Sequence, residues 1–363
     1  CKQAERTTKL IANLNGNIEK LDSLIAVAKA WISSFEKEIL IVRQLRAIER
    51  MIAISRSKRD PFRHIGGSLL RGYFSEIDRS WQYYLVYIPT NYDSLKRLPV
   101  IVHLHPAFGK NTPNYSLHSA EHYWLKQVRH RENLAERFGY VVVWPTGRGR
   151  SLYEGIGQED ILRVLADMEQ DYSIDTTKIM LLSYSEGGTA TLNYASHFPD
   201  KFAAVGVVGA YTDMQSLSQD PSLSAPYKLY LASRNTIDFS ANLSNMAVIL
   251  LHGTEDKLSH ISHSRKMFER LSKLGAAVTL HELSNAGQAD YSLQDPEEIM
   301  YKWFHDLQPR NPATAVSLRT AELKFGKSHF VKVEELAKSW NVAEIIADYH
   351  RPNRMDVTTR NVR

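Results

Sequence analysis

Cysteine is nearly absent from the 363-residue sequence, which has a single one, at position 1. One cysteine excludes a disulfide within the chain and a metal site built from several thiolates. Long apolar runs are missing as well. The best of them, from Leu24 to Ile32, is interrupted by Lys29 and is shorter than the ~18 residues that a membrane helix needs. The net charge of +5 is small and no basic stripe interleaved with aromatic residues is present, so nucleic acid is not an expected partner.

Motifs that mark cofactor chemistry are also absent. The sequence contains no H-E-x-x-H, no G-x-x-x-x-G-K and no strand-linked G-x-G-x-x-G. We therefore expect no metal, nucleotide or flavin cofactor. What remains is an ordinary globular composition, 43% hydrophobic and 23% charged, in a chain long enough for one large domain and an appendage.

The N-terminal segment, residues 1–58, contains no proline and one glycine. Its apolar residues recur at steps of three and four from Ile11 to Val42, which predicts a helix, or two helices broken near Gly16. We expect 8–54 to be largely helical and either to pack on the main domain or to mediate self-association. Cys1 stands where a lipid-modified bacterial lipoprotein begins, which predicts an exported, periplasmic or cell-surface protein with membrane attachment; an arbitrary chain boundary is the alternative.

From about residue 68, short apolar segments alternate with helical patterns. This alternation is typical of an α/β protein with a parallel sheet covered by helices on both faces. We predict a doubly wound, mostly parallel sheet of about seven or eight strands. A Ser/Pro/Asp-rich insertion over 211–244 is expected to overhang the site. The strand candidates are Trp81–Ile88, Val100–Leu104, Tyr140–Trp144, Ile179–Leu182, Phe202–Val208, Ala247–Leu251 and Val278–Leu283, and the helices between them centre near Leu134, Leu162, Leu192, Met267 and Trp303.

One segment, Lys178 to Tyr194, combines a buried strand, a hard turn and a helix. Within it, Ser183-Tyr184-Ser185-Glu186-Gly187 has the spacing of a nucleophile elbow, in which a strained turn lifts the middle serine clear of the sheet. The first position of that pattern is normally glycine and here is Ser183, a small residue. The apolar strand before the turn and the helical pattern after it favour the elbow over a chance serine beside glycines. Ser185 is the predicted nucleophile at the carboxyl end of a central strand.

In order and content, these segments resemble the α/β-hydrolase superfamily, and within it the esterase and prolyl-oligopeptidase-like group of serine hydrolases. The resemblance covers about residues 70–310 and implies a hydrolase domain over 68–310. Beyond it, LRTAELKFGKSHFVKVEEL and RMDVTTRNV look like the opening strands of a partial β-rich module over 311–363. The matching segments are RGYFSEIDRSWQYYLVYIPTNY, LPVIVHLHP, YEGIGQEDILRVLADMEQDYSIDTTKIMLLSYSEGG, FPDKFAAVGVVGAYTD and VILLHGTEDKLSHISHSRKM.

The resemblance implies a catalytic triad in the order Ser, Asp, His. Asp256, just after an apolar strand, matches the second position, with Glu255 as the nearby substitute and capping of the helix near Ser262 as the structural alternative. The histidine position is occupied by Gln288. An amide keeps hydrogen-bonding capacity but is no base near neutral pH.

Three other histidines are alternative candidates for the missing base. His260 and His263 follow Asp256, and His281 lies on the preceding strand, but none has the spacing of the triad histidine. Surface or helix-start roles are expected for each of them.

The oxyanion hole requires two backbone N–H donors. One is expected from Glu186. The other belongs to the loop after Leu104, where Pro106 has no N–H, so Ala107 or Phe108 is the expected donor.

Two classes of function follow from these groups. The first is a serine hydrolase acting on a carboxylic ester, on a small molecule or an acylated polysaccharide, with low activity because Gln288 replaces the base. The second is a catalytically degenerate binding module with the same fold, and a prolyl-oligopeptidase-like peptidase is a third candidate.

Overall fold

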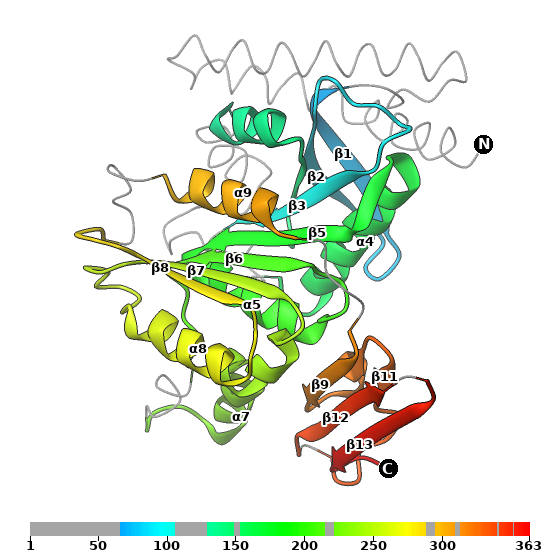
Figure 1. Ribbon diagram of the computed structural model, residues 1–363, viewed down its shortest axis with the longest axis vertical. Helices are drawn as coiled ribbons and strands as arrows, with labels where there is room; N and C mark the ends of the chain where they lie inside the picture. Colours follow the sequence, from blue (N-terminus) through cyan, green and yellow to red (C-terminus); the bar gives the residue numbers. More distant parts are fainter. Residues whose placement is uncertain are drawn as a thin grey trace.

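A computed structural model describes residues 66–105, 129–148, 153–214, 221–287, 295–308, 313–339, 341–350 and 352–363. The expected N-terminal helical segment and Cys1 lie outside these residues, as do Pro106, Ala107, Phe108 and Gln288. The described chain forms one large sheet flanked by helices, followed by a smaller β-rich segment (Figure 1).

The large sheet has eight strands in the order β1-β2-β4-β3-β5-β6-β7-β8. The pairs β1–β2 and β2–β4 are antiparallel, and the five other pairs are parallel. This topology confirms the predicted doubly wound, mostly parallel sheet. The strands are β1 (Gly67–Ser75), β2 (Ser80–Ile88), β3 (Leu98–Leu104), β4 (Val141–Pro145), β5 (Ile174–Tyr184), β6 (Ala204–Val208), β7 (Ala247–Gly253) and β8 (Val278–Leu283).

All seven expected strands are present. Most of their ends differ from the expected bounds by no more than two residues, and two differences are larger. β5 begins at Ile174 rather than Ile179, because Ile174 pairs with Leu98 at the start of β3. The register then shifts across the polar residues 175–178, and pairing resumes between Ile179 and Val100. β1 was not expected. It alternates buried and half-exposed residues along the edge of the sheet, so it lacks the continuous apolar run that marks the inner strands.

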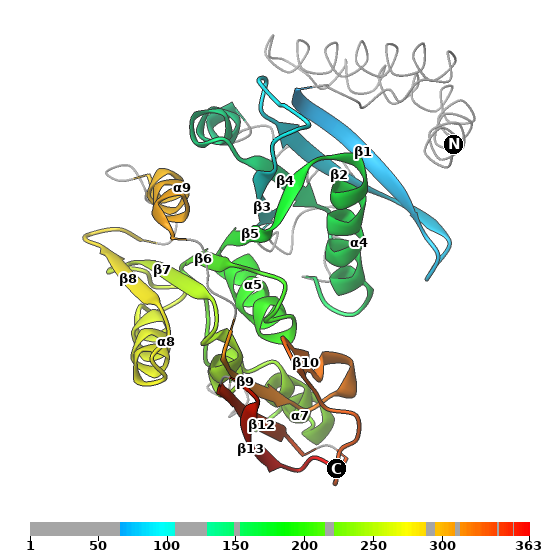
Figure 2. The same cartoon turned by 45° about the vertical axis from the view of Figure 1, so that its right-hand side comes forward.

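Alternation along the inner strands produces two cores, one on each face of the sheet. Val141 and Val143 of β4 belong to one core, and Val142 and Trp144 to the other. α4, α5 and α8 cover the first face, while α9 and the helix 129–138 cover the second (Figure 2). Full burial of each large apolar side chain stabilises the fold by about 1.5–3 kcal/mol. The helices are α4 (Ile156–Asp171), α5 (Ser185–His197), α7 (Ala225–Ser233), η2 (Thr236–Leu243), α8 (Ser262–Lys273) and α9 (Pro296–Asp306).

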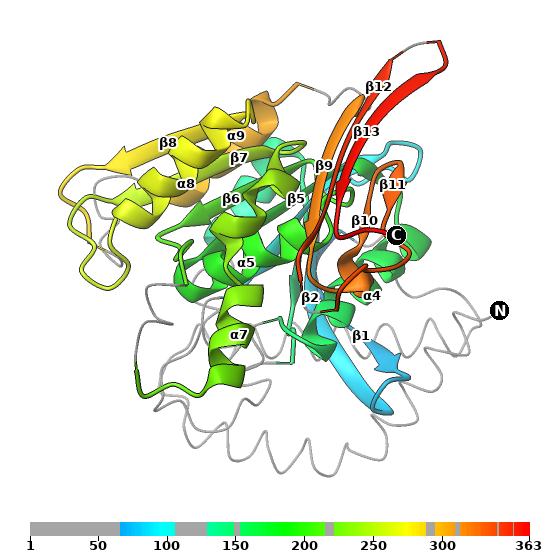
Figure 3. The same cartoon turned by 90° about the horizontal axis from the view of Figure 1, so that it is seen from below.

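The C-terminal strands form a separate small sheet in the order β13-β12-β9, with a core of its own (Figure 3). Asn242 joins this segment to the domain built on the large sheet, because its side chain bonds the backbone N–H and carbonyl of Arg319 at 2.6 and 2.8 Å. None of the helices in the described ranges is long and apolar enough to cross a membrane. The elements are β9 (Ala315–Thr320), η3 (Leu323–Phe325), β10 (Lys327–Ser328), β11 (Val331–Lys332), β12 (Ala343–His350) and β13 (Arg354–Arg360).

Candidate active site

Ser185 stands at the junction of β5 and α5, at the carboxyl ends of the parallel strands. β5 ends at Tyr184, and α5 begins with Ser185 itself. The φ of Ser185 is 52°, in the left-handed region that residues with a side chain rarely adopt. Such a conformation costs about 1–3 kcal/mol and persists where the surrounding structure fixes it, as at active sites. The strain, the partial exposure and the strand-to-helix turn together match a nucleophile elbow.

Small residues around Ser185 allow α5 to pack close to the strands. A Cβ added to Gly187 would lie 2.5 Å from the carbonyl oxygen of His105, and one added to Gly188 would lie 3.0 Å from Ala210 Cβ. Ser183, which replaces the usual glycine, is fully buried and donates its hydroxyl to the Leu104 carbonyl at 2.6 Å. Its polar atom is therefore satisfied within the sheet, which explains why serine fits at this position.

Asp256 lies in the connection between β7 and α8, and its side chain is buried. Its Oδ1 accepts hydrogen bonds from the backbone N–H groups of Leu258 and Ser259, both at 2.9 Å. These bonds hold the carboxylate within its own loop, whereas α8 begins without a side-chain cap, so the expected alternative of helix capping is not observed. Oδ2 is buried and receives no donor from the described residues. A buried carboxylate oxygen needs a donor, which is what a triad partner would supply.

Gln288 immediately follows the last described residue of the loop after β8. That loop lies against the Asp256 connection, because Ala286 accepts a hydrogen bond from the N–H of Glu255 at 3.0 Å. The hydroxyl of Thr254 accepts another from the N–H of Asn285 at 2.9 Å. Gly253 has no side chain at the point where the Ala286 carbonyl approaches it. The placement of Gln288 beside Ser185 and Asp256 stays a prediction.

His252, which the sequence did not single out, lies nearest to the free oxygen of Asp256, with Nε2 3.5 Å from Oδ2. Nε2 also lies 2.6 Å from the Ser259 carbonyl and therefore carries the ring proton, because a carbonyl only accepts. Nδ1 then accepts from the Ser264 hydroxyl at 2.7 Å. Burial lowers the pKa of His252. With both nitrogens engaged, this histidine is a structural residue and not a free base.

The three histidines that are alternative candidates for the base have other contacts. His260 is exposed, and its Nδ1 bonds the hydroxyl of Ser262 at 2.9 Å, as expected for a helix-start residue. His263 packs its ring edge-on against Tyr211 at 4.9 Å, and burial lowers its pKa. His281 lies on β8 in register with Leu251.

Tyr211 forms a wall of the site that the sequence analysis did not single out. Its N–H donates to the hydroxyl of Thr189 in the first turns of α5 at 2.9 Å, and its own hydroxyl donates to the Leu258 carbonyl beside Asp256. Burial raises the pKa of Tyr211, and the charges of Asp256 and Glu186 raise it further. Tyr211 is thus bonded both to α5 and to the loop that carries Asp256. Its sequence signal is its place directly after β6.

The expected oxyanion donors are only partly described. Glu186, whose N–H is the expected first donor, is exposed at the start of α5. Ala107 and Phe108 follow His105, the last described residue after β3, and their role stays a prediction. Within the described ranges, no three or more His, Cys, Asp or Glu side chains are grouped to hold a metal ion.

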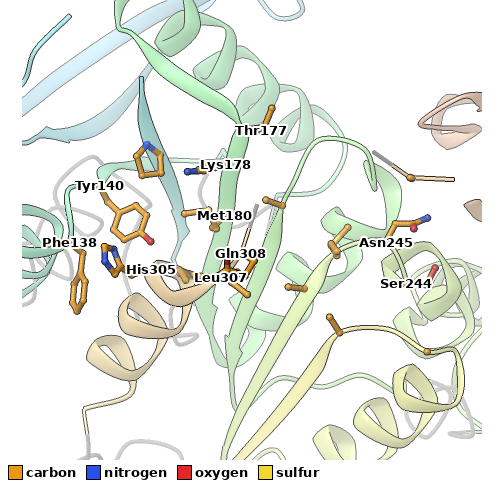
Figure 4. Close-up of a pocket in the computed structure, with 18 of the residues that line it drawn as sticks. Phe138, Tyr140, Thr177, Lys178, Met180, Ser244, Asn245, His305, Leu307 and Gln308 are labelled. Atoms are coloured by element: carbon orange, nitrogen blue, oxygen red, sulfur yellow. The ribbon is translucent and has the colours of Figure 1, made fainter. Parts of the chain in front are cut away.

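A groove of about 910 Å³ opens near the amino ends of the parallel strands, at the other end of the sheet from Ser185 (Figure 4). It is lined by the beginnings of strands, including Lys178 and Ala247, and by the end of α9. Figure 4 shows Tyr140, Lys178 and His305 together at one end. Because Ser185 lies at the carboxyl ends of the strands, this groove does not contain the candidate nucleophile.

Comparison with known proteins gives a family match. The model of the prolyl oligopeptidase family matches residues 126–308, half of the chain. A bifunctional acetylxylan esterase/xylanase, XynS20E of Neocallimastix patriciarum, is 31% identical over 123 residues, which are 33% of this chain and 16% of the relative. The chain therefore aligns with only a small part of that relative's length.

Solved structures match more of the chain at lower identity. The fluorophosphonate-binding serine hydrolase FphF of Staphylococcus aureus is 17% identical, with a TM-score of 0.50 over 67% of this chain and 99% of that one. An acylaminoacyl peptidase bound to Z-Gly-Gly-Phe-chloromethyl ketone is 18% identical, with a TM-score of 0.51 over 68% of this chain and 42% of that one. At these identities the likeness shows the fold alone, that of the α/β hydrolases.

Proposed function

The chain belongs to the prolyl oligopeptidase family, and from that premise we propose that it is an esterase-type serine hydrolase with Ser185 as its nucleophile. The observation that carries this proposal is the left-handed backbone of Ser185 at the turn between a central parallel strand and a helix. A left-handed φ is uncommon for a residue other than glycine, and strained residues of this kind cluster at active sites.

In the proposed reaction, Ser185 Oγ attacks the carbonyl carbon of an ester. The N–H of Glu186 donates to the oxyanion that develops. The proton of the Ser185 hydroxyl passes, through water or a general base, to the departing alkoxide, so the alcohol leaves as the acyl-enzyme forms, and water then hydrolyses this intermediate to the acid and free Ser185. Asp256 is placed to orient a base through its buried Oδ2. With glutamine at position 288, no proton acceptor is supplied at the family's position, so we expect low turnover as the chain stands.

The proposed substrate is the ester of a small molecule or an acylated polysaccharide. Support comes from the acetylxylan esterase relative.

A labelling experiment tests the proposal. A fluorophosphonate probe should label the protein at Ser185 and should not label the Ser185→Ala variant, which is also the background control for turnover of p-nitrophenyl acetate. Absence of labelling in both the folded parent and the folded Gln288→His variant would refute the esterase assignment.

Gln288 favours a second candidate, a degenerate binding module with this fold. This candidate predicts no ester turnover above the Ser185→Ala background together with saturable binding of an acylated oligosaccharide. The family also includes the peptidase alternative. Cleavage of a peptide p-nitroanilide faster than the matched ester would favour it over the esterase.

A further inference from the structure

Two segments far apart in sequence meet at His105, just beyond β3. The backbone N–H of His105 donates to the hydroxyl of Tyr153 at 2.7 Å, and its ring Nε2 donates to the carbonyl of Thr146 at 3.1 Å. The rings of His105 and Tyr153 also pack together, with centroids 4.8 Å apart. Both residues are 1% exposed. The connection after β4 therefore holds His105 by its backbone and by its side chain.

The backbone that presents Tyr153 is strained. Tyr153 and Arg148 have φ values of 62° and 60°, in the left-handed region. Gly147 lies against the Tyr153 ring so closely that a Cβ there would overlap it. Arg148 is anchored by Asp160 at 2.6 Å. Strained conformations of this kind cluster where the surrounding structure must fix a group for function.

On its other side, His105 lies against the elbow. A Cβ on Gly187, two residues after Ser185, would lie 2.5 Å from the His105 carbonyl oxygen. The preceding residue of β3, Leu104, accepts the hydroxyl of Ser183. The position of His105 thus sets the gap between the end of β3 and the start of α5, the two places that supply oxyanion donors in the proposed reaction.

We infer that Tyr153 is a positioning residue for this reaction: its hydroxyl fixes His105 against the elbow and so aligns the backbone N–H of Glu186 with Ser185. This inference rests on the proposed function. Donors misplaced by about 1 Å lower the rate of such reactions by about 10²-fold, and loss of one donor costs about 10²–10³-fold.

The test is Tyr153→Phe, which removes one oxygen and keeps the ring packed against Gly147 and His105. We expect kcat for p-nitrophenyl acetate to fall at least about tenfold, with KM and Tm close to those of the parent. The rate of fluorophosphonate labelling should fall in parallel, because phosphonylation uses the same oxyanion donors. The matched control is Tyr84→Phe, whose buried hydroxyl has no hydrogen-bond partner among the described residues and whose rates should not change.

All rates are measured in the natural sequence and in the Gln288→His background, so that a weak base does not hide the effect. Unchanged kcat and labelling in Tyr153→Phe would overturn the inference. A fall in kcat that is accompanied by a higher KM and a lower Tm would also overturn it, because such a combined change indicates a structural role only.

If neither background reacts with ester or probe, the proposed function fails, and the inference is then judged on the amide of His105. Hydrogen exchange there should be at least about tenfold faster in Tyr153→Phe than in Tyr84→Phe, since the lost acceptor exposes that N–H. Equal exchange rates would refute the positioning of His105 by Tyr153.

Discussion

The carboxylate of Asp256 has hydrogen-bond donors on only one of its two oxygens among the described residues. One of its oxygens has two backbone donors, while the other is buried with none from the described chain. The described part of the loop after β8, up to Gly287, is bonded to the same connection through the Ala286 carbonyl and the Glu255 N–H. A donor and base at position 288 would complete the arrangement, and glutamine supplies only the donor.

We therefore predict that Gln288→His raises esterase activity by about 10²-fold or more. Only a neutral imidazole accepts the serine proton, so kcat/KM should rise as the pH passes about 6.5. Steady-state kinetics with p-nitrophenyl acetate measure both effects. Gln288→Asn, which keeps an amide, should gain nothing, and adding Asp256→Asn to Gln288→His should remove the gain.

Two other results would show that position 288 does not limit activity in the way predicted. If the natural sequence turns over esters briskly and loses that activity on mutation of His260, His263 or His281, the family position is not the one in use. If Gln288→His gains nothing although the imidazole reaches Ser185, the defect lies in the oxyanion loop at Pro106.

A second prediction at this scale concerns Gly187. An added methyl group would meet the His105 carbonyl and the Ser183 hydroxyl, and neither can move without shifting β3 or α5. Gly187→Ala should lower the free energy of unfolding by about 1–3 kcal/mol and should abolish fluorophosphonate labelling. Gly287→Ala, where an added Cβ meets nothing within 4 Å, is the stability control in urea unfolding. Equal unfolding midpoints for the two variants would contradict the close packing.

At the scale of elements, the sequence predicts the inner strands best. β6 and β7 are largely runs of β-branched and aliphatic residues bounded by polar turns. The edge strand β8, VTLHEL, includes polar residues and still occupies the expected residues. The start of β5 reads IDTTK, whose polar side chains are exposed, so periodicity does not reveal it. The sequence pattern does not reveal the edge strand β1 either, because its residues alternate between buried and half-exposed and include two glycines.

The candidate site divides in the same way. Ser185 and Asp256 belong to short local patterns that follow strands, so the sequence identifies them. Tyr153 and Tyr211 act through contacts with residues 48 and 47 positions away, His105 and Leu258, and no local pattern encodes such contacts. His252 is a buried strand residue whose role depends on the loop that folds over it.

The end of α5 and η3 meet in a contact that should respond to pH. His197 stacks on Phe325, with centroids 3.8 Å apart, and its Nδ1 accepts from Gln158 at 3.0 Å. Burial, together with Arg234 and Lys324, lowers the pKa of His197 to about 3. In the unfolded chain the pKa is about 6.5, so between these values the unfolded state binds more protons and stability falls as the pH falls.

We predict that Tm drops on acidification from pH 7 to pH 5, and that His197→Phe reduces the drop. Phenylalanine keeps the ring contact with Phe325 and removes the titrating group, although the Gln158 amide loses its acceptor. The comparison is the difference in Tm between the two pH values, variant against parent. Gln158→Ala, which removes the amide and leaves the imidazole, should retain the dependence on pH. A variant as acid-sensitive as the parent would place the responsible group elsewhere, for example at His103, whose pKa burial and Arg131 lower to about 4.

For the whole molecule, the C-terminal sheet is attached to the hydrolase-like core by a small number of specific contacts. Asn242, 2% exposed, bonds both backbone groups of Arg319 and also donates to the Ser196 carbonyl at 2.8 Å. Arg234 reaches Glu154 on the core and Glu322 beyond β9, at 3.5 and 3.4 Å. Partly exposed pairs of this kind contribute little, so the buried amide is the stronger attachment.

Asn242→Ala should therefore loosen the C-terminal sheet more than any exchange of these surface charges. It leaves three backbone groups without their partner, at about 1–3 kcal/mol for each group that stays buried and unpaired. We expect a lower Tm and early proteolytic loss of residues 313–363, with the core fragment still folded because its two cores lie on the large sheet. Asn245→Ala, three residues along the same connection, is the matched control. If proteolysis releases the core and the C-terminal sheet together in both variants, the two parts unfold as one unit, and Asn242 does not govern their attachment.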